Sequence, residues 1–340
     1  MAVTMQQIAE RAGLSRPTVS QILSNKGYLY SPKTREKVCR IAKEMGYRPN
    51  AYARSVVTKK FGAIALLLST EKHRSYLPGH LLDGINDELE KHNYHLSVMK
   101  LPDEKLCKQG FLPKALREWL SDGLLVNYNV HIPNKLIQII ENSSLPAVWI
   151  NVNRKSDCLY PNDYKAAREA VRHLVARGYK KIAYVSYSFE QHDLLEPTHY
   201  SIIDRYRGYL DEVKALGLKP LEPILPECKL PRKERLNFTY NWLMKKNRPD
   251  AIIAYARSTA LPIIWCASQS GLDIPKDLAV ITFSSEDPIT ELGFTVTSFD
   301  VSEYEIGRKV TCLLMEKIKN PELRFEPYTI DYKLIKGDTT

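Results

Sequence analysis

The 340-residue sequence has no long apolar run, no cysteine pair and no secretion signal, and each absence excludes a class of protein. No apolar stretch approaches the roughly 18 residues that a membrane-spanning helix needs, so we expect no membrane partner. The six cysteines are scattered and form no Cys-x-x-Cys pair, which argues against a disulfide framework or a metal site and favours reduced thiols. The first residues, MAVTMQQIAERAG, lack the basic and apolar regions of a signal peptide, so a cytoplasmic protein is expected.

The residues from which active sites are built are equally sparse. Neither a Gly-x-Gly-x-x-Gly pattern nor a P-loop is present, so we expect no nucleotide and no other cofactor. The eight histidines all follow residue 72 and form no His-x-x-x-His or His-Glu pair, so no metal is expected. His92 and His95 fit a helix end and a strand start, and Asp83, Asp87 and Glu88 fit a solvated helix face. We propose no catalytic residue and expect a protein that is not an enzyme.

Positive charge is in excess, and it is concentrated near the N-terminus. Residues 1–60 contain 12 Lys or Arg and 3 Glu, which leaves 37 basic and 36 acidic residues for positions 61–340. An evenly distributed excess would indicate no more than a solvated basic surface. A compact basic segment attached to a nearly neutral body is instead typical of a protein that binds a polyanion.

Capping residues and apolar spacing predict three short helices in this basic segment. Thr4 is suited to cap a helix that starts at residue 5, with Gln7 in the capping-box position. Ser15 is suited to cap a second helix with Pro17 in its first turn, and Ser31 is suited to cap a third. Glycines at positions 13 and 46 are expected to end the first and third helices. The apolar positions that recur at helical spacing are Met5, Ile8, Ala9 and Ala12, then Val19, Ile22 and Leu23, and finally Val38, Ile41, Ala42 and Met45.

The first two helices and the short glycine-containing turn between them predict a helix-turn-helix within an all-α domain at residues 1–49. The second helix of such a motif enters the major groove of DNA by its N-terminal end, where this sequence has Arg16 and Gln21. Arginine binds O6 and N7 of guanine, and glutamine pairs with adenine, so both side chains are suited to read base edges. The alternative for this segment is a small helical bundle that binds another protein.

The same segment resembles the DNA-binding region of the LacI/GalR family of bacterial transcription regulators. The similarity lies in VTMQQIAERAGLSRPTVSQILSNK, followed by SPKTREKVCRIAKEMGYRPNAYARS, and it involves several motifs in the family's order. It implies a helix-turn-helix, a third supporting helix and a hinge helix that forms on operator DNA. Five of the predicted contacts (positions 15, 18, 31, 34 and 50) are expected to hold phosphates or to cap helices. The predicted DNA-binding residues are Thr4, Ser15, Arg16, Pro17, Thr18, Ser20, Gln21, Ser31, Thr34, Tyr47, Asn50, Ala53 and Val56.

The hinge and its linker are assigned to residues 50–60. The resemblance implies that a leucine of the hinge is wedged into the central minor-groove step of the operator, and this sequence has Val56 there. Such wedging costs a few kcal/mol of unstacking, which is offset by the contacts that bent DNA allows. Valine is shorter and β-branched, so we expect a shallower wedge and a weaker hinge helix. The alternative is that Val56 is only a linker residue.

The rest of the chain predicts an α/β body. Short apolar runs typical of buried strands occur at 62–68, 95–101, 123–128, 146–151, 181–187, 250–255 and 278–283, with amphipathic segments between several of them. Continuous apolar strands separated by helices indicate parallel sheets that are covered on both faces. Positions 61–340 are too many for one small sheet, so two lobes are expected.

The family resemblance extends through this body, in segments such as LPAVWIN, RPDAIIAY and GLDIPKDLAVITF. It implies a periplasmic-binding-protein-like core in which the chain crosses three times between two lobes. We place the first lobe at about 61–160 and 291–322, and the second at about 161–290 and 323–340. The resemblance also implies dimerisation along the lobes. A dimer is expected rather than a tetramer, because no heptad repeat occurs at the C-terminus.

The cleft between the lobes is the expected effector site, because ligands of such sheets bind beyond the carboxyl ends of the strands. Arg205 matches the family's effector-gripping arginine, whereas Arg257 and Ser284 replace acidic residues that the family usually has. Two arginines without a nearby carboxylate favour an anionic ligand such as a sugar acid or sugar phosphate. The alternative is a cleft that binds no ligand. The predicted effector-binding residues are Asn127, Asn151, Arg205, Arg257 and Ser284.

These features together predict a sequence-specific transcriptional regulator, expected to be a repressor. It would bind a pseudo-palindromic double-stranded operator as a homodimer and would respond to a small sugar-like effector. The alternative from another class is a soluble small-molecule-binding protein for which DNA binding is secondary. The missing signal peptide and the attached basic segment argue against that alternative.

Overall fold

The computed structural model describes residues 3–24, 27–49, 60–71, 74–102, 114–118, 120–190, 192–195, 198–227, 230–284, 290 and 293–340. The chain forms two compact units, Met1–Phe61 and Gly62–Thr340, and each unit is described by itself. Within the described ranges, no helix has the length and the apolar character needed to cross a membrane. Three predicted DNA contacts of the hinge, Asn50, Ala53 and Val56, lie outside the described residues.

The first unit contains the three predicted helices, and their N-termini are capped as predicted. Thr4 forms a capping box with Gln7, and the side chains of Ser15 and Ser31 accept N–H groups of the helices that follow them. Gly13 follows the first helix with a φ of 67°, a left-handed conformation that glycine adopts at no steric cost. The elements are α1 (Met5–Ala12), α2 (Arg16–Leu23), η1 (Gly27–Leu29) and α3 (Pro32–Glu44). Their buried core consists of Ile8, Ala9, Ala12, Val19, Ile22, Val38, Ile41 and Ala42.

The second unit contains two sheets, one in each lobe. The first sheet has the strand order β10-β5-β4-β3-β1-β2, and its neighbouring strands are parallel. Its strands are β1 (Ala63–Ser69), β2 (His95–Leu101), β3 (Gly123–Val126), β4 (Ala147–Ile150), β5 (Cys158–Pro161) and β10 (Tyr328–Ile330). The second sheet has the order β11-β9-β8-β7-β6, with β11 antiparallel to β9 and the other pairs parallel. Its strands are β6 (Ile182–Val185), β7 (Ala251–Ala254), β8 (Ala279–Ser284), β9 (Ser298–Asp300) and β11 (Lys333–Ile335).

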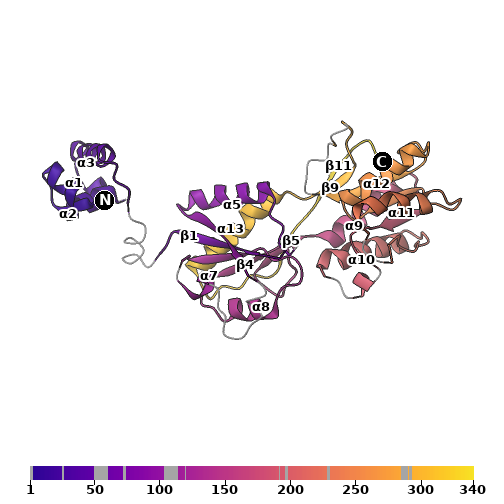
Figure 1. Ribbon diagram of the computed structural model, residues 1–340, viewed down its shortest axis with the longest axis horizontal. Helices are drawn as coiled ribbons and strands as arrows, with labels where there is room; N and C mark the ends of the chain where they lie inside the picture. Colours follow the sequence, from indigo (N-terminus) through magenta and orange to yellow (C-terminus); the bar gives the residue numbers. More distant parts are fainter. Residues whose placement is uncertain are drawn as a thin grey trace. The chain divides into compact units, whose positions relative to one another are not determined.

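Helices cover both faces of the sheets (Figure 1). In strand β1, alternate residues of the apolar run pack into two different hydrophobic cores, one on each face of the sheet. Ile64 and Leu66 pack in the core formed with α5 and α13, whereas Ala65 and Leu67 pack in the core formed with α8. The first lobe contains α5 (Gly79–Lys91), α7 (Lys114–Arg117), α8 (Asn134–Glu141) and α13 (Glu303–Lys319). The second contains α9 (Asp163–Val175), η2 (His192–Leu194), α10 (Tyr200–Ala215), η3 (Arg232–Glu234), α11 (Arg235–Leu243) and α12 (Arg257–Gln269).

The strand pairing corrects the expected lobe boundaries. Strand β9 was expected in the first lobe but pairs with β8 of the second sheet, and β10 was expected in the second lobe but pairs with β5 of the first. The chain therefore crosses between the sheets after β5, after β9 and between β10 and β11. Strands β9, β10 and β11 have three residues each, which is too short for their apolar pattern to indicate a sheet.

The same close helix contact occurs in both lobes. A Cβ atom at Gly84 of α5 would lie 2.1 Å from the carbonyl oxygen of Tyr304 in α13. A Cβ atom at Gly208 of α10 would lie 2.4 Å from the carbonyl oxygen of Tyr164 in α9. Only glycine therefore permits either pair of helices to approach this closely.

The two lobes also have the same residue types at two of the positions that follow Gly84 and Gly208. Three positions later, Asp87 accepts a hydrogen bond from the hydroxyl of Tyr304 at 2.8 Å, and Asp211 accepts one from Tyr164 at 2.9 Å. Four positions later stands a buried glutamate in each lobe, Glu88 and Glu212. Glu88 was expected on a solvated face, and this expectation is wrong, because α13 packs over it and contributes an arginine 3.7 Å away.

Candidate functional site

Helix α2 presents the predicted base-reading side chains to solvent, with Arg16 at its N-terminal end and Gln21 in its second half. Arg16, Pro17 and Gln21 are exposed, because Val19 and Ile22 on the other side of the helix are buried in the core. Ser20 lies half-buried at the edge of the same face. An exposed helix face that carries an arginine and a glutamine has the form that major-groove recognition requires.

Gln21 is held by a partner that the sequence did not indicate. Its Oε1 accepts a hydrogen bond from the hydroxyl of Tyr30 at 2.5 Å. The amide oxygen thus accepts a hydrogen bond from within the protein. The NH₂ group of Gln21 is the part of the amide that can donate hydrogen bonds. Tyr30 follows η1, and the fixed orientation of Gln21 depends on how this turn folds back on α2. Such a contact is not visible in helix periodicity.

The hydroxyl pairs at the starts of α2 and α3 are built alike. Ser15 Oγ accepts the N–H of Thr18 at 3.2 Å, and Ser31 Oγ accepts the N–H of Thr34 at 3.2 Å. Within each pair the two side-chain oxygens are 2.9 Å and 2.8 Å apart. Neither helix has an acidic residue in its first turn, so the partial positive charge of each helix N-terminus remains available to an anion.

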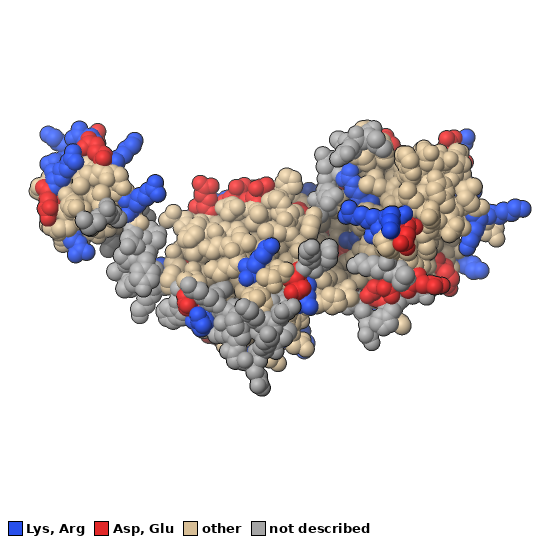
Figure 2. Space-filling model, viewed as in Figure 1, with Lys and Arg blue, Asp and Glu red and all other residues tan. Residues whose placement is uncertain are grey.

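The first unit displays several Lys and Arg side chains together with a few acidic ones (Figure 2). Thr4 uses its side chain in the capping box of α1, and Tyr47 packs against the core, where burial raises the pKa of its hydroxyl. Tyr28 and Leu29 of η1 are 73% and 59% exposed, although they are large and apolar. Neither residue was predicted as a contact, and the apolar character of η1 next to α2 is the feature that could have suggested them.

In the second unit, Asn151 stands where the two lobes touch. It follows β4 in a left-handed conformation, with a φ of 55°. Its backbone carbonyl accepts a hydrogen bond from Nε2 of His199 at 3.1 Å, and its Oδ1 accepts one from the hydroxyl of Tyr200 at 3.0 Å. Burial lowers the pKa of His199, which keeps the imidazole neutral. Asn151 therefore joins the carboxyl end of the first sheet to the start of α10 in the second lobe.

Arg205 is enclosed by protein groups. Its Nε donates to Oδ1 of Asp163 at 2.5 Å, and its Nη2 donates to the hydroxyl of Tyr332 at 3.0 Å. The guanidinium carbon also lies 4.5 Å from the ring centre of Phe283. Burial alone would lower the pKa of Arg205, but Asp163 outweighs it, so the pKa is raised well above its usual value.

These contacts correct the expectation that Arg205 lacks a nearby carboxylate. Asp163 is 1% exposed and starts α9, directly after the chain crosses from the first sheet to the second. The resemblance to the family places the acidic partners at strand ends. The carboxylate of this chain is supplied instead by a helix start 42 positions earlier in the sequence.

Asn127 is a buried structural residue at the carboxyl end of β3. Only 1% of it is exposed, and its Nδ2 donates to the backbone carbonyl of Tyr76 at 2.7 Å. Its Oδ1 accepts from Nδ2 of Asn129, which also donates to the carbonyl of Ile150 at 3.3 Å. Asn127 therefore ties together the segments that follow β1, β3 and β4.

Arg257 and Ser284 lie at the carboxyl edge of the second sheet. Ser284 is the last residue of β8, and Arg257 starts α12, three positions after the end of the neighbouring strand β7. Both are half-buried. Tyr255 and Phe283, which contact Arg205, precede them in the chain. The structure thus brings Arg205, Arg257 and Ser284 to one edge of one sheet, whereas Asn127 and Asn151 belong to the first.

Comparison with known proteins agrees with this architecture. The sequence model of bacterial regulatory proteins, lacI family, matches residues 4–50, and that of the periplasmic binding protein-like domain matches residues 171–340. Catabolite control protein A of Staphylococcus xylosus is 26% identical over 343 residues, which cover 97% of this chain and 96% of that protein. The HTH-type transcriptional repressor PurR of Actinobacillus pleuropneumoniae is 22% identical over 332 residues, which cover 97% and 95%.

Solved structures show the same fold. The Lac repressor dimer bound to operator and the anti-inducer ONPF has a TM-score of 0.77 at 20% identity, covering 100% of this chain and 99% of that one. The complex of the transcriptional regulator CelR with cellobiose has a TM-score of 0.66 at 20% identity, covering 99% and 100%.

A capped helix-turn-helix followed by a two-lobed α/β body defines a class of DNA-binding regulators that carry their own ligand-binding domain. The chain belongs to the LacI family of bacterial regulatory proteins. It is a transcriptional regulator with a DNA-binding domain and an effector-binding domain, and not an enzyme.

Proposed function

We propose that this regulator is a homodimeric, sequence-specific repressor that binds a pseudo-palindromic operator with α2 and responds to a small ligand between its lobes. The observation that carries the proposal is the exposed face of α2, on which Arg16 in the first turn and Gln21 in the second half of the helix lie outside the core. Most of the excess positive charge of the chain belongs to the same segment. Repression is supported by the relatives that are named repressors. An operator target would also fit a cytoplasmic protein.

In this proposal, base reading and phosphate contact are divided between two sets of residues. Arg16 and Gln21 read base edges, with Gln21 oriented by Tyr30. The hydroxyl pairs at the starts of α2 and α3 hold phosphates, because their helix N-termini carry no acidic residue. Pro17, Ser20 and Tyr47 border this surface. The proposed hinge contacts are Asn50, Ala53 and Val56.

The proposal of a homodimer is supported by an apolar face on α12. Leu261 and Trp265 are one helical turn apart and are 37% and 50% exposed. Solvent-exposed tryptophan is unfavourable, and aromatic residues are enriched where two protein chains meet. A second copy of the chain that presents the same face would cover both side chains, and it would supply the second helix-turn-helix that a pseudo-palindrome requires.

The proposed effector is an acidic small molecule, and Arg257 is its main anchor. Arg205 forms a buried ion pair with Asp163, so in this proposal it positions the edge of the second sheet. Arg257 and Ser284 lie half-buried at that edge, where a carboxylate or phosphate could reach both. Asn151 and Asn127 hold the opposite edge, in the first lobe, through the hydrogen bonds described above.

Selection from a random pool of double-stranded DNA by the full-length protein tests the DNA-binding proposal. The expected product is a pseudo-palindrome of two half-sites, because a symmetric dimer places two copies of α2 about one helical turn of DNA apart. Enrichment of a single asymmetric half-site would contradict the dimer. Absence of any enriched sequence would contradict specific recognition.

A thermal-shift screen tests the effector separately. We expect sugar acids or sugar phosphates to stabilise the full-length protein, and we expect the Arg257→Ala variant to lose that response. Stabilisation by neutral monosaccharides that is equal in both proteins would rule out an acidic effector. No response to any small molecule would indicate a cleft without a ligand.

A further inference from the structure

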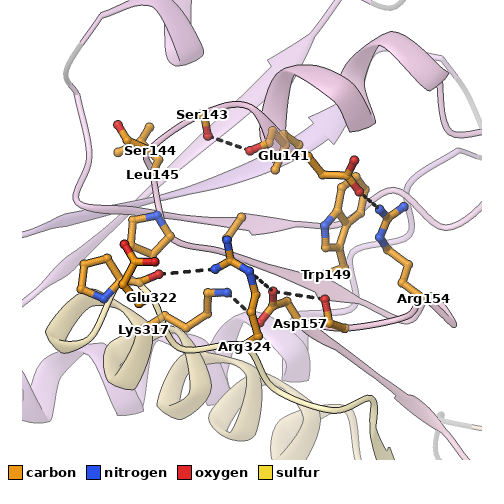
Figure 3. Close-up of a pocket in the computed structure, with 15 residues that line it drawn as sticks. Glu141, Ser143, Ser144, Leu145, Trp149, Arg154, Asp157, Lys317, Glu322 and Arg324 are labelled. Atoms are coloured by element: carbon orange, nitrogen blue, oxygen red, sulfur yellow. Dashed lines mark hydrogen bonds and ion pairs between the residues drawn. The ribbon is translucent and has the colours of Figure 1, made fainter.

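A cavity of about 470 Å³ lies in the first lobe, between the ends of α8 and α13 and the start of β4 (Figure 3). Its lining contains three cations and three carboxylates. Nζ of Lys317 and Nε of Arg324 lie 2.6 Å and 3.7 Å from the oxygens of Asp157. Arg154 pairs with Glu141 at 2.5 Å. Because these charges balance and pair with one another, the cavity indicates no ligand.

The turn that follows α2 packs closely against that helix. Gly27, the first residue of η1, is buried, and a Cβ atom there would lie 3.1 Å from the carbonyl oxygen of Ile22. Tyr30 follows η1, and its N–H donates to the carbonyl of Gly27 at 3.1 Å. The ring of Tyr30 is half-buried against the core of the first unit. Packing therefore determines where the Tyr30 hydroxyl lies relative to α2.

This hydroxyl determines which atoms of Gln21 are directed toward DNA. Gln21 lies four residues after Pro17, so it shares the exposed face of α2 with the start of the helix. Its Oε1 accepts the hydrogen bond from the Tyr30 hydroxyl at 2.5 Å. The oxygen and the nitrogen of an amide point in different directions, so an oxygen turned toward Tyr30 directs the NH₂ group away from it. Gln21 therefore presents a donor with two N–H bonds to a base.

The four bases differ in what they offer to such a donor in the major groove. Guanine has two neighbouring acceptors, O6 and N7, and the NH₂ group can donate to both. Adenine has one acceptor, N7, next to the N6 donor, and its usual pair with glutamine needs the amide oxygen as well as the nitrogen. Thymine offers O4, and cytosine offers only its N4 donor. An NH₂ group whose amide oxygen is engaged elsewhere therefore favours guanine over adenine.

We propose that Tyr30 is a positioning residue that makes Gln21 read guanine in each half-site, in place of the adenine that a glutamine with a free amide oxygen would read. This inference rests on the proposed recognition of an operator by α2. It adds to that function the class of base at one position and the residue that selects it.

Fluorescence anisotropy of the full-length protein with the operator selected from the random pool, and with its single-base variants, tests the proposal. The position read by Gln21 is the one at which Gln21→Ala loses its base preference. There we expect the wild-type protein to bind guanine about tenfold more tightly than adenine, since one donor–acceptor contact is gained and a facing pair of donors is avoided. In Tyr30→Phe the amide oxygen is released, and this ratio should fall to about one.

The substitution Tyr30→Phe removes only the hydroxyl and keeps the ring in the core, so the fold of the first unit should be retained. Tyr28→Phe is the matched control, because Tyr28 belongs to the same turn but is 73% exposed. This control should keep the guanine preference of the wild-type protein. Base preference at the other positions of the half-site should be the same in all three proteins.

The outcomes separate this inference from the function on which it rests. Adenine preference in the wild-type protein, or an unchanged guanine preference in Tyr30→Phe, would overturn the inference and leave operator recognition intact. Equal weakening of Tyr30→Phe on every variant would also overturn it, because Tyr30 would then have only a structural role. Unaltered preference at every position in Gln21→Ala would show that Gln21 reads no base. Absence of any sequence preference in the wild-type protein would contradict the proposed function, and this inference with it.

Discussion

Asp163 on α9 accepts a hydrogen bond from Nε of Arg205 on α10, and the two side chains are 1% and 13% exposed. The hydroxyl of Tyr332 donates to the same Oδ1 at 2.9 Å, so the segment between β10 and β11 joins the pair. Removing one member of a buried ion pair leaves the other charge uncompensated, at a cost of about 3–5 kcal/mol. We expect Asp163→Asn to lower the free energy of unfolding by this order in urea denaturation at pH 7.

Asp331→Asn is a suitable control for this substitution. Asp331 lies one residue before Tyr332 and pairs with Lys165 at 2.5 Å, but both of these side chains are about half exposed. Exposed pairs contribute little, so only a small change is expected. Equal losses in the two variants would show that burial is not what makes the Asp163–Arg205 pair important.

Arg16→Ala is expected to relax base preference at one or two positions of each half-site. The guanidinium is exposed at the start of α2, and loss of a bidentate base contact costs about 1–3 kcal/mol. Fluorescence anisotropy with a set of single-base operator variants measures the effect. Uniform weakening on every variant would instead identify Arg16 as a phosphate contact.

The neighbouring Ser15→Ala substitution separates folding from recognition. Ser15 caps α2 by accepting the N–H of Thr18, and loss of such a cap costs about 1 kcal/mol of stability. We expect this variant to weaken binding to all operators without changing the order of base preference.

Substitutions at Val56 test the hinge assignment. Val56→Leu should tighten operator binding or increase DNA bending, because a longer apolar side chain unstacks the central step more completely. Val56→Gly should weaken binding strongly, because glycine has a lower helix propensity than valine and removes the apolar wedge. Circular-permutation gel shifts measure the bend. Unchanged affinity and bending in both variants would make the segment only a tether.

Gly84→Ala and Gly208→Ala should both destabilise the second unit. Each new Cβ would meet a backbone carbonyl of the facing helix, at 2.1 Å and 2.4 Å, so the helices must move apart. Overpacking of this kind costs about 1–3 kcal/mol. Gly79→Ala is the control, because a Cβ at the start of α5 has no neighbour within 4 Å. Thermal unfolding of the three variants should show a loss only in the first two.

The local features of the fold could be predicted from the sequence because they depend on neighbouring residues. Thr4, Ser15 and Ser31 cap their helices as predicted, since a cap involves side chains and N–H groups within three positions. Six of the seven apolar runs form buried strands as predicted, whereas the run at 95–101 forms β2, in which Leu101 is the one buried residue, so the expectation of a buried strand is wrong there. The two-sided burial of the other six follows from the absence of polar residues at alternate positions.

Features that depend on distant residues could not be predicted in this way. The carboxylate that neutralises Arg205 is 42 positions away, and the arginine that helps to bury Glu88 belongs to α13, 220 positions later in the chain. The tyrosine that orients Gln21 follows a turn whose geometry no periodic pattern describes. A sequence shows residue types at these positions, but their pairing is decided by how the helices pack.

His173 links α9 to the C-terminal residue of the chain. Its ring is buried, with Nε2 2.8 Å from Oγ1 of Thr340 and Nδ1 3.3 Å from Nη1 of Arg177. Burial, helped by Arg177 and Lys336, lowers its pKa from 6.5 to about 4. The unfolded chain therefore binds a proton more readily than the folded one between these values.

The sign of the pH dependence follows from this difference. Stability from His173 is fully present above pH 6.5 and is lost as the pH falls toward 4, by up to about 3 kcal/mol. We expect urea denaturation at pH 7, 5.5 and 4.5 to show this loss. His173→Gln, which keeps a donor toward Thr340 but cannot be protonated, should reduce the loss between pH 7 and 4.5. Carboxylates also titrate in this range, so the difference between the two proteins is the quantity that reports on His173. Parallel curves for the two proteins would mean that the imidazole is protonated as readily in the folded chain as in the unfolded one.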